Sequence, residues 1–274
     1  MSQEHLPQLG VDVVLARAPL DSPLGELAEL IGGFDEAQLR QLRNVARAMR
    51  IEVEHTLHEG SDIVSEAFNN EMCARLQTHH GTHTQPLDRI SWEDAFRAGM
   101  EQDGRTVTAA LSATNRFYDI RVDEENIALK STKAKSVSKT TIHISKLCEA
   151  AWIQDARSKT LRRDATFRMI RAFQDSVDRI LQLRVIPDLI HWRYELVEVP
   201  LRLFAGVFDL NLNAFNADGP RLDVRDAEGA AMKLVIDRSD SKITIAGVPK
   251  SRCVVHALWV LPKDMRLTRI ENEE

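Results

Sequence analysis

The sequence predicts an α/β protein in which helices flank a mixed β-sheet. Three observations predict this class. Apolar residues recur at helical spacing through most of the first hundred residues. Short alternating segments rich in β-branched residues begin near Arg105, and segments of both kinds then follow one another to the C-terminus. Helix, strand, hairpin, helix and further strands in that order indicate a mixed sheet within one compact domain.

Residues 1–90 form a helical N-terminal region in this interpretation, and residues 91–274 form the main core. One helix is expected within 34–58, where apolar residues recur every three or four positions. A second is expected from Ser61 to about Thr78, followed by a polar loop over 79–83. A third is expected to begin at Ser91, in a pattern that resembles a capping box, and to end at Asp103–Gly104.

The strands and the remaining helices are expected after residue 104. Residues 105–111, 117–122 and 127–130 are predicted strands, and the last two are joined by a tight turn over 123–126. Two helices are expected over 142–156 and 162–183. The remaining strands are predicted at 194–199, 206–212, 222–224, 232–236, 242–245 and 254–261.

Charge is distributed unevenly along a chain whose net charge is -5. Residues 51–103 contain eleven acidic residues and three arginines, whereas residues 130–163 contain nine basic residues and only Glu149 and Asp155 as acids. A cationic stretch within an acidic protein is typical of one face that binds a polyanion, although a solvated basic helix would give the same count. We expect this stretch to face nucleic acid.

The chain is expected to be cytoplasmic. It contains no apolar run of the roughly 20 residues that a membrane-spanning helix needs. Its three cysteines, Cys73, Cys148 and Cys253, are far apart and odd in number, which fits free thiols in a reducing compartment.

Asp119 and Lys130 are the candidate catalytic pair. They are predicted on neighbouring strands of a hairpin, and because such strands lie about 5 Å apart, both side chains can reach one phosphate. Carboxylates hold a divalent ion against a scissile phosphate, and a nearby lysine lowers the pKa of the attacking water or stabilises the transition state. Glu93, on the preceding helix, is a further carboxylate candidate.

Four segments in this region resemble the core of the PD-(D/E)XK nucleases, a superfamily that includes most type II restriction endonucleases. They are Trp92–Phe96, Gly104–Val107, Tyr118–Ile120 and Ile127–Ser131. Two later segments, Tyr194–Pro200 and Cys253–Trp259, resemble type II restriction endonucleases more loosely. The resemblance implies a restriction-endonuclease-like mixed sheet, Mg²⁺ as cofactor, and site-specific hydrolysis of phosphodiester bonds in double-stranded DNA.

The sequence departs from the superfamily pattern at Ala128, where an acidic residue usually stands two positions before the lysine. Some members with a small residue there take the missing carboxylate from the next helix. On that analogy Glu149 is the replacement, so Asp119 and Glu149 are the expected metal ligands. Glu93 or Glu71 is expected as an outer carboxylate.

Candidate DNA contacts follow the hairpin and recur in a later polar loop. Lysines interleaved with hydroxyl residues suit phosphate contacts, and arginines and polar loop residues suit base edges. The candidates are Lys133, Lys135, Lys139, Arg157, Lys159, Arg162, Arg163, Arg238, Asp240 and Lys242. A two-fold symmetric homodimer is expected on DNA, with one active site for each strand.

Two other functions remain open at this stage. One is a repair or phage-type nuclease that recognises DNA structure. The other is a DNA-binding protein that has lost the chemistry, which Ala128 favours. The histidines at 79, 80 and 83 with Cys73 match no standard zinc spacing, and we expect no zinc site there.

Overall fold

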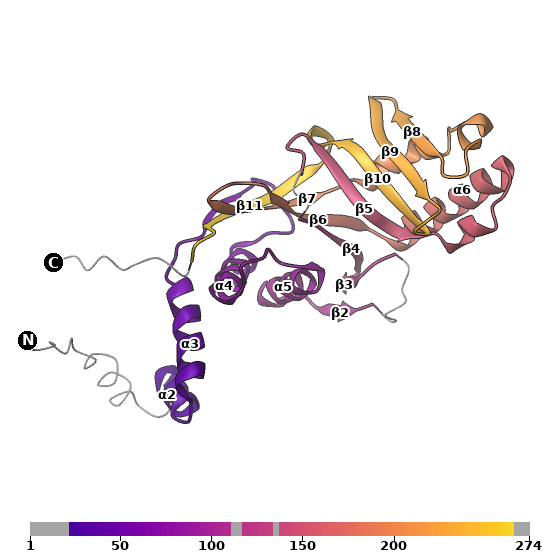
Figure 1. The fold of residues 1–274 in the computed structure, drawn as a ribbon. Helices are drawn as coiled ribbons and strands as arrows, with labels where there is room; N and C mark the ends of the chain where they lie inside the picture. Colours follow the sequence, from indigo (N-terminus) through magenta and orange to yellow (C-terminus); the bar gives the residue numbers. More distant parts are fainter. Residues whose placement is uncertain (1–21, 111–116, 134–136, 266–274) are drawn as a thin grey trace, which may run out of the picture.

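The computed structural model describes residues 22–110, 117–133 and 137–265, and within them it has two β-sheets and five α-helices (Figure 1). The larger sheet has seven strands in the order β1-β11-β7-β6-β4-β3-β2. The β4 and β6 strands pair in parallel, whereas the other neighbours pair antiparallel. In that order the strands are β1 (Glu54–Leu57), β11 (Val254–Pro262), β7 (His191–Glu198), β6 (Arg179–Ile186), β4 (Glu125–Thr132), β3 (Ile120–Val122) and β2 (Val107–Ala109).

The second sheet is antiparallel and has the order β5-β10-β9-β8. Its inner face packs on the α6 helix (Lys159–Ser176) and on short 3-10 helices, forming one of the two hydrophobic cores. The strands are β5 (Thr141–Glu149), β10 (Lys242–Pro249), β9 (Gly229–Asp237) and β8 (Arg221–Asp226). The 3-10 helices are η1 (Ala151–Gln154), η2 (Leu201–Val207), η3 (Leu212–Phe215) and η4 (Lys250–Arg252).

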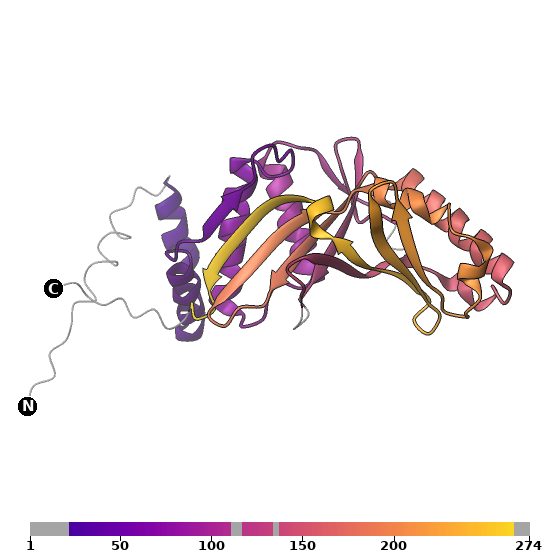
Figure 2. The same ribbon diagram turned by 90° about the horizontal axis from the view of Figure 1, so that it is seen from above.

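The other core lies between the larger sheet and two helices, α4 (Glu66–Thr82) and α5 (Arg89–Gln102). Trp92 and Phe96 of α5 are fully buried against it, which fixes the helix over the sheet. The helices α2 (Pro23–Ile31) and α3 (Glu36–Ala48) extend from this side of the molecule. Seen from above, they stand at one end of an elongated body, and α6 with the second sheet stands at the other (Figure 2).

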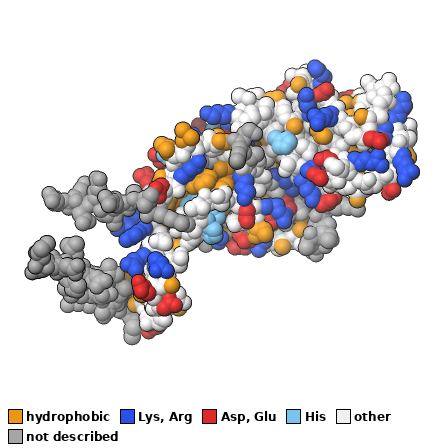
Figure 3. Space-filling view, viewed as in Figure 1, with side chains coloured by type: hydrophobic (Ala, Val, Ile, Leu, Met, Phe, Trp, Pro, Cys, Tyr) orange, Lys and Arg blue, Asp and Glu red, His pale blue; other side chains and the backbone are white. Residues whose placement is uncertain are grey.

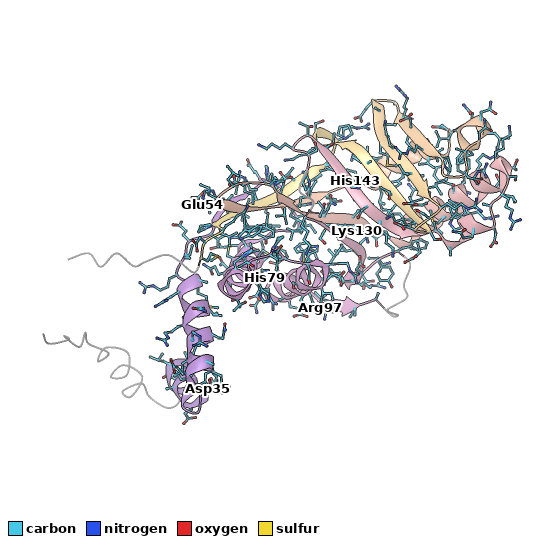
Figure 4. The ribbon with its side chains drawn as sticks, viewed as in Figure 1. Asp35, Glu54, His79, Arg97, Lys130 and His143 are labelled. Carbon is cyan, nitrogen blue, oxygen red and sulfur yellow. The ribbon has the colours of Figure 1, made fainter. Side chains whose placement is uncertain are left out.

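The β4 strand belongs to both cores because side chains alternate across a strand. Ile127 and Leu129 point into the core beneath α4 and α5, whereas Ala128 points into the core of the second sheet. Lys130 lies on the same face of β4 as Ala128, and its side chain is partly exposed. The place where the two sheets meet is therefore the place where Lys130 emerges (Figure 4).

Several expectations about the elements were wrong, and the largest error concerns residues 142–156. They form the β5 strand and the η1 3-10 helix. Along the strand, burial alternates: Ile142 and Ile144 are buried, whereas His143 between them and Ser145 after them are exposed. Likewise, the predicted strand at 206–212 is made of 3-10 turns. The predicted helix at 162–183 ends at Ser176 and gives way to β6, and the helix within 34–58 gives way to β1.

The expected hairpin and most later strands are confirmed, with shifted ends. The α4 helix continues to Thr82, so the histidines at 79 and 80 are helical and not in a loop. The α5 helix begins at Arg89, and its N-cap is Asp88, whose carboxylate accepts a hydrogen bond from the Ser91 amide. Its end at Asp103–Gly104 is confirmed, and Gly104 has the positive φ of 77° that suits glycine.

Two further expectations concern the environment of the chain. No helix in the described ranges is long and apolar enough to cross a membrane. None of the three cysteines forms a disulfide.

Candidate active site

The β3–β4 hairpin fixes Asp119 and Lys130 side by side. The Asp119 amide donates to the carbonyl of Ile127 across the hairpin, at 3.0 Å. Its Oδ2 accepts a hydrogen bond from the Leu129 amide at 2.7 Å and lies 3.2 Å from Lys130 Nζ. Backbone bonds therefore orient this carboxylate before any ligand arrives. The pairing that the sequence predicted is present.

Glu93 and Arg89 approach the same aspartate from α5, where they lie one turn apart. Arg89 Nη1 is 3.0 Å from Glu93 Oε1 and 3.9 Å from Asp119 Oδ1. Burial, and then the negative charge of Asp119, raise the pKa of the Glu93 carboxyl, while Arg89 and Lys130 oppose this. Arg89 thus approaches both carboxylates, and Lys130 contacts Asp119.

Some of these residues line one wall of a hollow of about 470 Å³, whereas Glu93 is not among its lining residues. Arg89, Asp119 and Lys130 lie on this wall, and β5 contributes the opposite wall with Ser145, Lys146 and Glu149 among its residues. Gln182 of β6, paired in register with Lys130, donates to the His143 carbonyl of β5 at 2.8 Å. This bond ties the second wall to the sheet that carries the first.

Glu149 lies in the same hollow, although the reason given for expecting it there was wrong. It is on a strand, not on the apolar face of a helix, and 56% of its side chain is exposed. Its carboxylate pairs with Lys146, three residues earlier on the same strand. Glu149 is therefore a solvated group at the rim, on the wall opposite Asp119.

The residues present fit a hard divalent cation. Glu93 Oε1 is buried and receives no well-aligned hydrogen bond from any described residue, despite its proximity to Arg89. Oxygen ligands of this kind are those that Mg²⁺ takes, typically one or two carboxylates with water and substrate phosphate completing the shell. Within the described ranges no three acidic, histidine or cysteine side chains converge to enclose a metal, so a resident ion would need such outside ligands.

Glu71 and Ala128 lie outside the hollow. Glu71, on α4, pairs with Arg75 at 2.6 Å and lines a separate surface depression with His79. Of the two outer carboxylates that the sequence left open, only Glu93 lies beside Asp119. Ala128 is fully buried in the core of the second sheet, which explains why this position carries no acid.

The candidate DNA contacts are scattered over several surfaces. Lys133 and Lys139 are exposed beyond β4 and before β5, whereas Lys135 lies outside the described residues. Lys242 is the β10 partner of Glu149 and pairs with Asp240. Arg238 pairs with Asp218, Arg163 with Asp164, and Lys159 donates to Asn213, while Arg157 is exposed. Figure 3 shows basic side chains over the second sheet and α6, with acidic ones among them.

Arg162 does not fit its expected role in base recognition. It is 4% exposed, and its guanidinium donates to the carbonyl oxygens of Ala156, Arg157, Phe215 and Asn216. These bonds hold the η3 region against α6. An arginine whose donors are taken up inside the protein has none left for a duplex.

The sequence interpretation missed two cations of the hollow, Arg89 and Lys146. The spacing of four residues between Arg89 and Glu93 was a signal that could have identified the first, because residues so spaced meet on a helix. Lys146 was read as part of a helix. Its place on the same wall as Glu149 followed only once this segment was known to be a strand.

An aspartate and a lysine on one hairpin, with a helix-borne glutamate and an open hollow, form a site suited to hydrolysis of phosphodiesters. Comparison with known proteins identifies the class. Residues 27–261 match the family model SmaI, described as type II site-specific deoxyribonuclease. The chain belongs to this family, and it is a type II restriction endonuclease.

One curated relative is the type II restriction enzyme SmaI of Serratia marcescens. It is 28% identical over 235 residues, which cover 81% of this chain and 93% of the relative. No solved structure matches the chain. The family selects the restriction endonuclease over the structure-specific nuclease and the inactive DNA-binding protein that the sequence had left open.

Proposed function

We propose that Asp119, Lys130 and Glu93 form the catalytic centre of this endonuclease and that it requires Mg²⁺. The observation that carries the proposal is the contact of Lys130 Nζ with Asp119 Oδ2, beside a Glu93 carboxylate whose pKa is raised by burial and by Asp119. Bound Mg²⁺ would polarise the scissile phosphate and supply an activated water at neutral pH.

Each residue has a distinct part in this proposal. Asp119 and Glu93 would hold the ion through their carboxylates. Lys130, which is 16% exposed and faces the hollow, stabilises negative charge on the phosphate as it is attacked. Glu149 would contribute more weakly from the opposite wall, where its carboxylate is solvated at the rim of the hollow.

DNA binding in this proposal relies on the exposed cations, without Arg162. Lys133 and Lys139 contact the backbone next to the active site. We assign further contacts with phosphates and base edges to the half of the molecule formed by α6 and the second sheet. The residues there are Arg157, Lys159, Arg163, Arg238, Asp240 and Lys242.

We further propose a homodimer on DNA and a cytoplasmic location. Cleavage of both strands at one site needs two active sites, and a two-fold axis supplies them with matched polarity. Mass photometry with a duplex that the enzyme cleaves should give two protomers per site, and one protomer per site would contradict the dimer. Three cysteines that form no disulfide fit a reducing compartment.

Plasmid digestion tests the catalytic proposal. The wild-type enzyme with Mg²⁺ should give discrete fragments, and EDTA should abolish them. Asp119→Ala and Lys130→Ala should each lose cleavage while retaining their circular dichroism spectrum and their binding to the same DNA in EDTA. Discrete fragments at the wild-type rate from either variant would show that the site lies elsewhere.

A further inference from the structure

Arg89 occupies the space between the two carboxylates of the proposed metal site. Its guanidinium lies 3.0 Å from Glu93 Oε1 and 3.9 Å from Asp119 Oδ1. The other oxygen of Asp119 is already held by the Leu129 amide and by Lys130. Asp119 thus presents one oxygen fixed by the hairpin and one that, among the described residues, is approached by Arg89 of α5.

The interaction of Arg89 with the two carboxylates is weak. Its side chain is 65% exposed, whereas those of Glu93 and Asp119 are 22% and 21% exposed. Solvent screens such a pair, and a long exposed side chain loses conformational freedom when it is fixed, so a pair of this kind contributes little. A divalent cation that coordinates both carboxylates can replace the guanidinium.

We propose that Arg89 takes the place of the catalytic cation in the metal-free protein. When the cation binds, Arg89 leaves the two carboxylates and contacts a DNA phosphate. In the metal-free protein its guanidinium neutralises Asp119 and Glu93. When the ion enters, Arg89 is released toward the hollow that it already lines, where its planar donors suit a phosphate. This inference rests on the proposed metal site. Because the metal releases Arg89 for DNA, metal binding and DNA binding are cooperative.

A second pair on the neighbouring helix supplies the control. Arg75 and Glu71 have the same i,i+4 spacing on α4, and Arg75 Nε is 2.6 Å from the glutamate. No other ion pair reaches Arg75 among the described residues. If Arg89 acts only as a helix-stabilising partner, removal of either arginine should have the same consequences.

Calorimetric titration with Ca²⁺ at a pH near 8, in the absence of DNA, tests the inference. We expect Arg89→Ala to bind Ca²⁺ about fivefold more tightly than wild type, because the competing cation is gone. Arg75→Ala and Arg89→Lys should stay near wild type. With Ca²⁺ present, Arg89→Ala should bind a cleavable duplex several-fold more weakly than wild type. Equal or weaker Ca²⁺ binding by a folded Arg89→Ala would overturn the proposal.

Two further variants keep the result interpretable. Arg89→Gln replaces Arg89→Ala if the alanine variant does not give the wild-type circular dichroism spectrum, and the same gain in Ca²⁺ affinity is expected of it. Asp119→Asn distinguishes a wrong metal site from a wrong role for Arg89. Ca²⁺ binding that survives in Asp119→Asn contradicts the metal site itself. Its loss there, without a gain in Arg89→Ala, contradicts the role of Arg89 alone.

Discussion

The two walls of the catalytic hollow differ in how they hold their charged groups. On the wall formed by α5 and the β3–β4 hairpin, Asp119 is fixed by a backbone amide and a lysine, and Glu93 is half-buried beside it. On the β5 wall, Lys146 and Glu149 are each more than half exposed, and among the described residues they form an ion pair only with each other. The first wall is organised in advance of substrate, and the second is not.

From this difference we infer which carboxylates act in catalysis. A ligand set fixed before substrate binds requires no reorganisation during the reaction, which is where electrostatic catalysis gains most of its effect. A solvated carboxylate on a rim adjusts to a ligand but contributes less.

Asp119→Ala should have the largest effect on cleavage. It removes the oxygen that the hairpin orients and leaves Lys130 without its partner, so we expect single-turnover cleavage with Mg²⁺ to fall by at least about 10³-fold. Asp119→Asn retains the shape of the side chain and should fall nearly as far. A loss of less than tenfold in either variant would remove Asp119 from the centre.

Lys130→Ala should follow, with a loss of about 10²- to 10³-fold in the single-turnover rate. The lysine acts on the reacting phosphate and not on affinity, so DNA binding in Ca²⁺ should change little. Lys146→Ala, on the opposite wall, is the matched control and should retain most of the activity. Similar losses in the two lysine variants would contradict the proposed difference between the two walls.

Ala128→Glu tests whether the missing acid of the superfamily pattern can be restored. Ala128 is fully buried among apolar residues, so a carboxylate there lacks both space and partners. We expect a loss of about 2–4 kcal/mol in the free energy of unfolding by urea titration and no gain in cleavage. A stable and more active variant would show that position 128 opens onto the site.

Glu93→Gln and Glu149→Gln compare the two walls directly. We expect Glu93→Gln to lower cleavage by about 10- to 100-fold, as the loss of a carboxylate that supports a metal site does. Glu149→Gln, which removes an exposed rim charge, should lower it about fivefold or less. If the order of the two variants is reversed, the β5 wall carries the metal ligand.

The pH dependence of metal binding should be the smallest and most specific signature. Glu93 must be ionised to hold a cation, and its pKa is raised by burial and by Asp119. Ca²⁺ affinity should therefore weaken as pH falls through this raised pKa, at a higher pH than an ordinary glutamate would give. Calorimetry at several pH values should find a shallower dependence in Glu93→Gln. An unchanged profile would exclude Glu93 as the titrating group.

The same contrast explains how much the sequence could predict. The hairpin was predictable because its turn, its alternation and the pairing of Asp119 with Lys130 are local. The β5 segment was not, since Ile144, Leu147 and Cys148 have spacings that fit a helix as well as a strand with an irregular pairing. The choice between them depends on pairing with β10, nearly a hundred residues later in the chain.

Residues that depend on tertiary packing were the least predictable. Arg162 looks like any exposed arginine in sequence, and only the packing of η3 on α6 buries it. Glu93 and Glu71 were equal candidates until α5 was seen to lie beside the hairpin and α4 was not.

The proposed active site depends most on Asp119 and Glu93 holding the catalytic cation together. Anomalous diffraction from crystals grown with Mn²⁺ and a duplex that carries the cleavage site tests it directly. We predict a manganese peak about 2.0–2.3 Å from one oxygen of each of these carboxylates, with Arg89 turned away toward a phosphate. A peak coordinated by Glu149 but not by Glu93, or none at Asp119, would contradict the account.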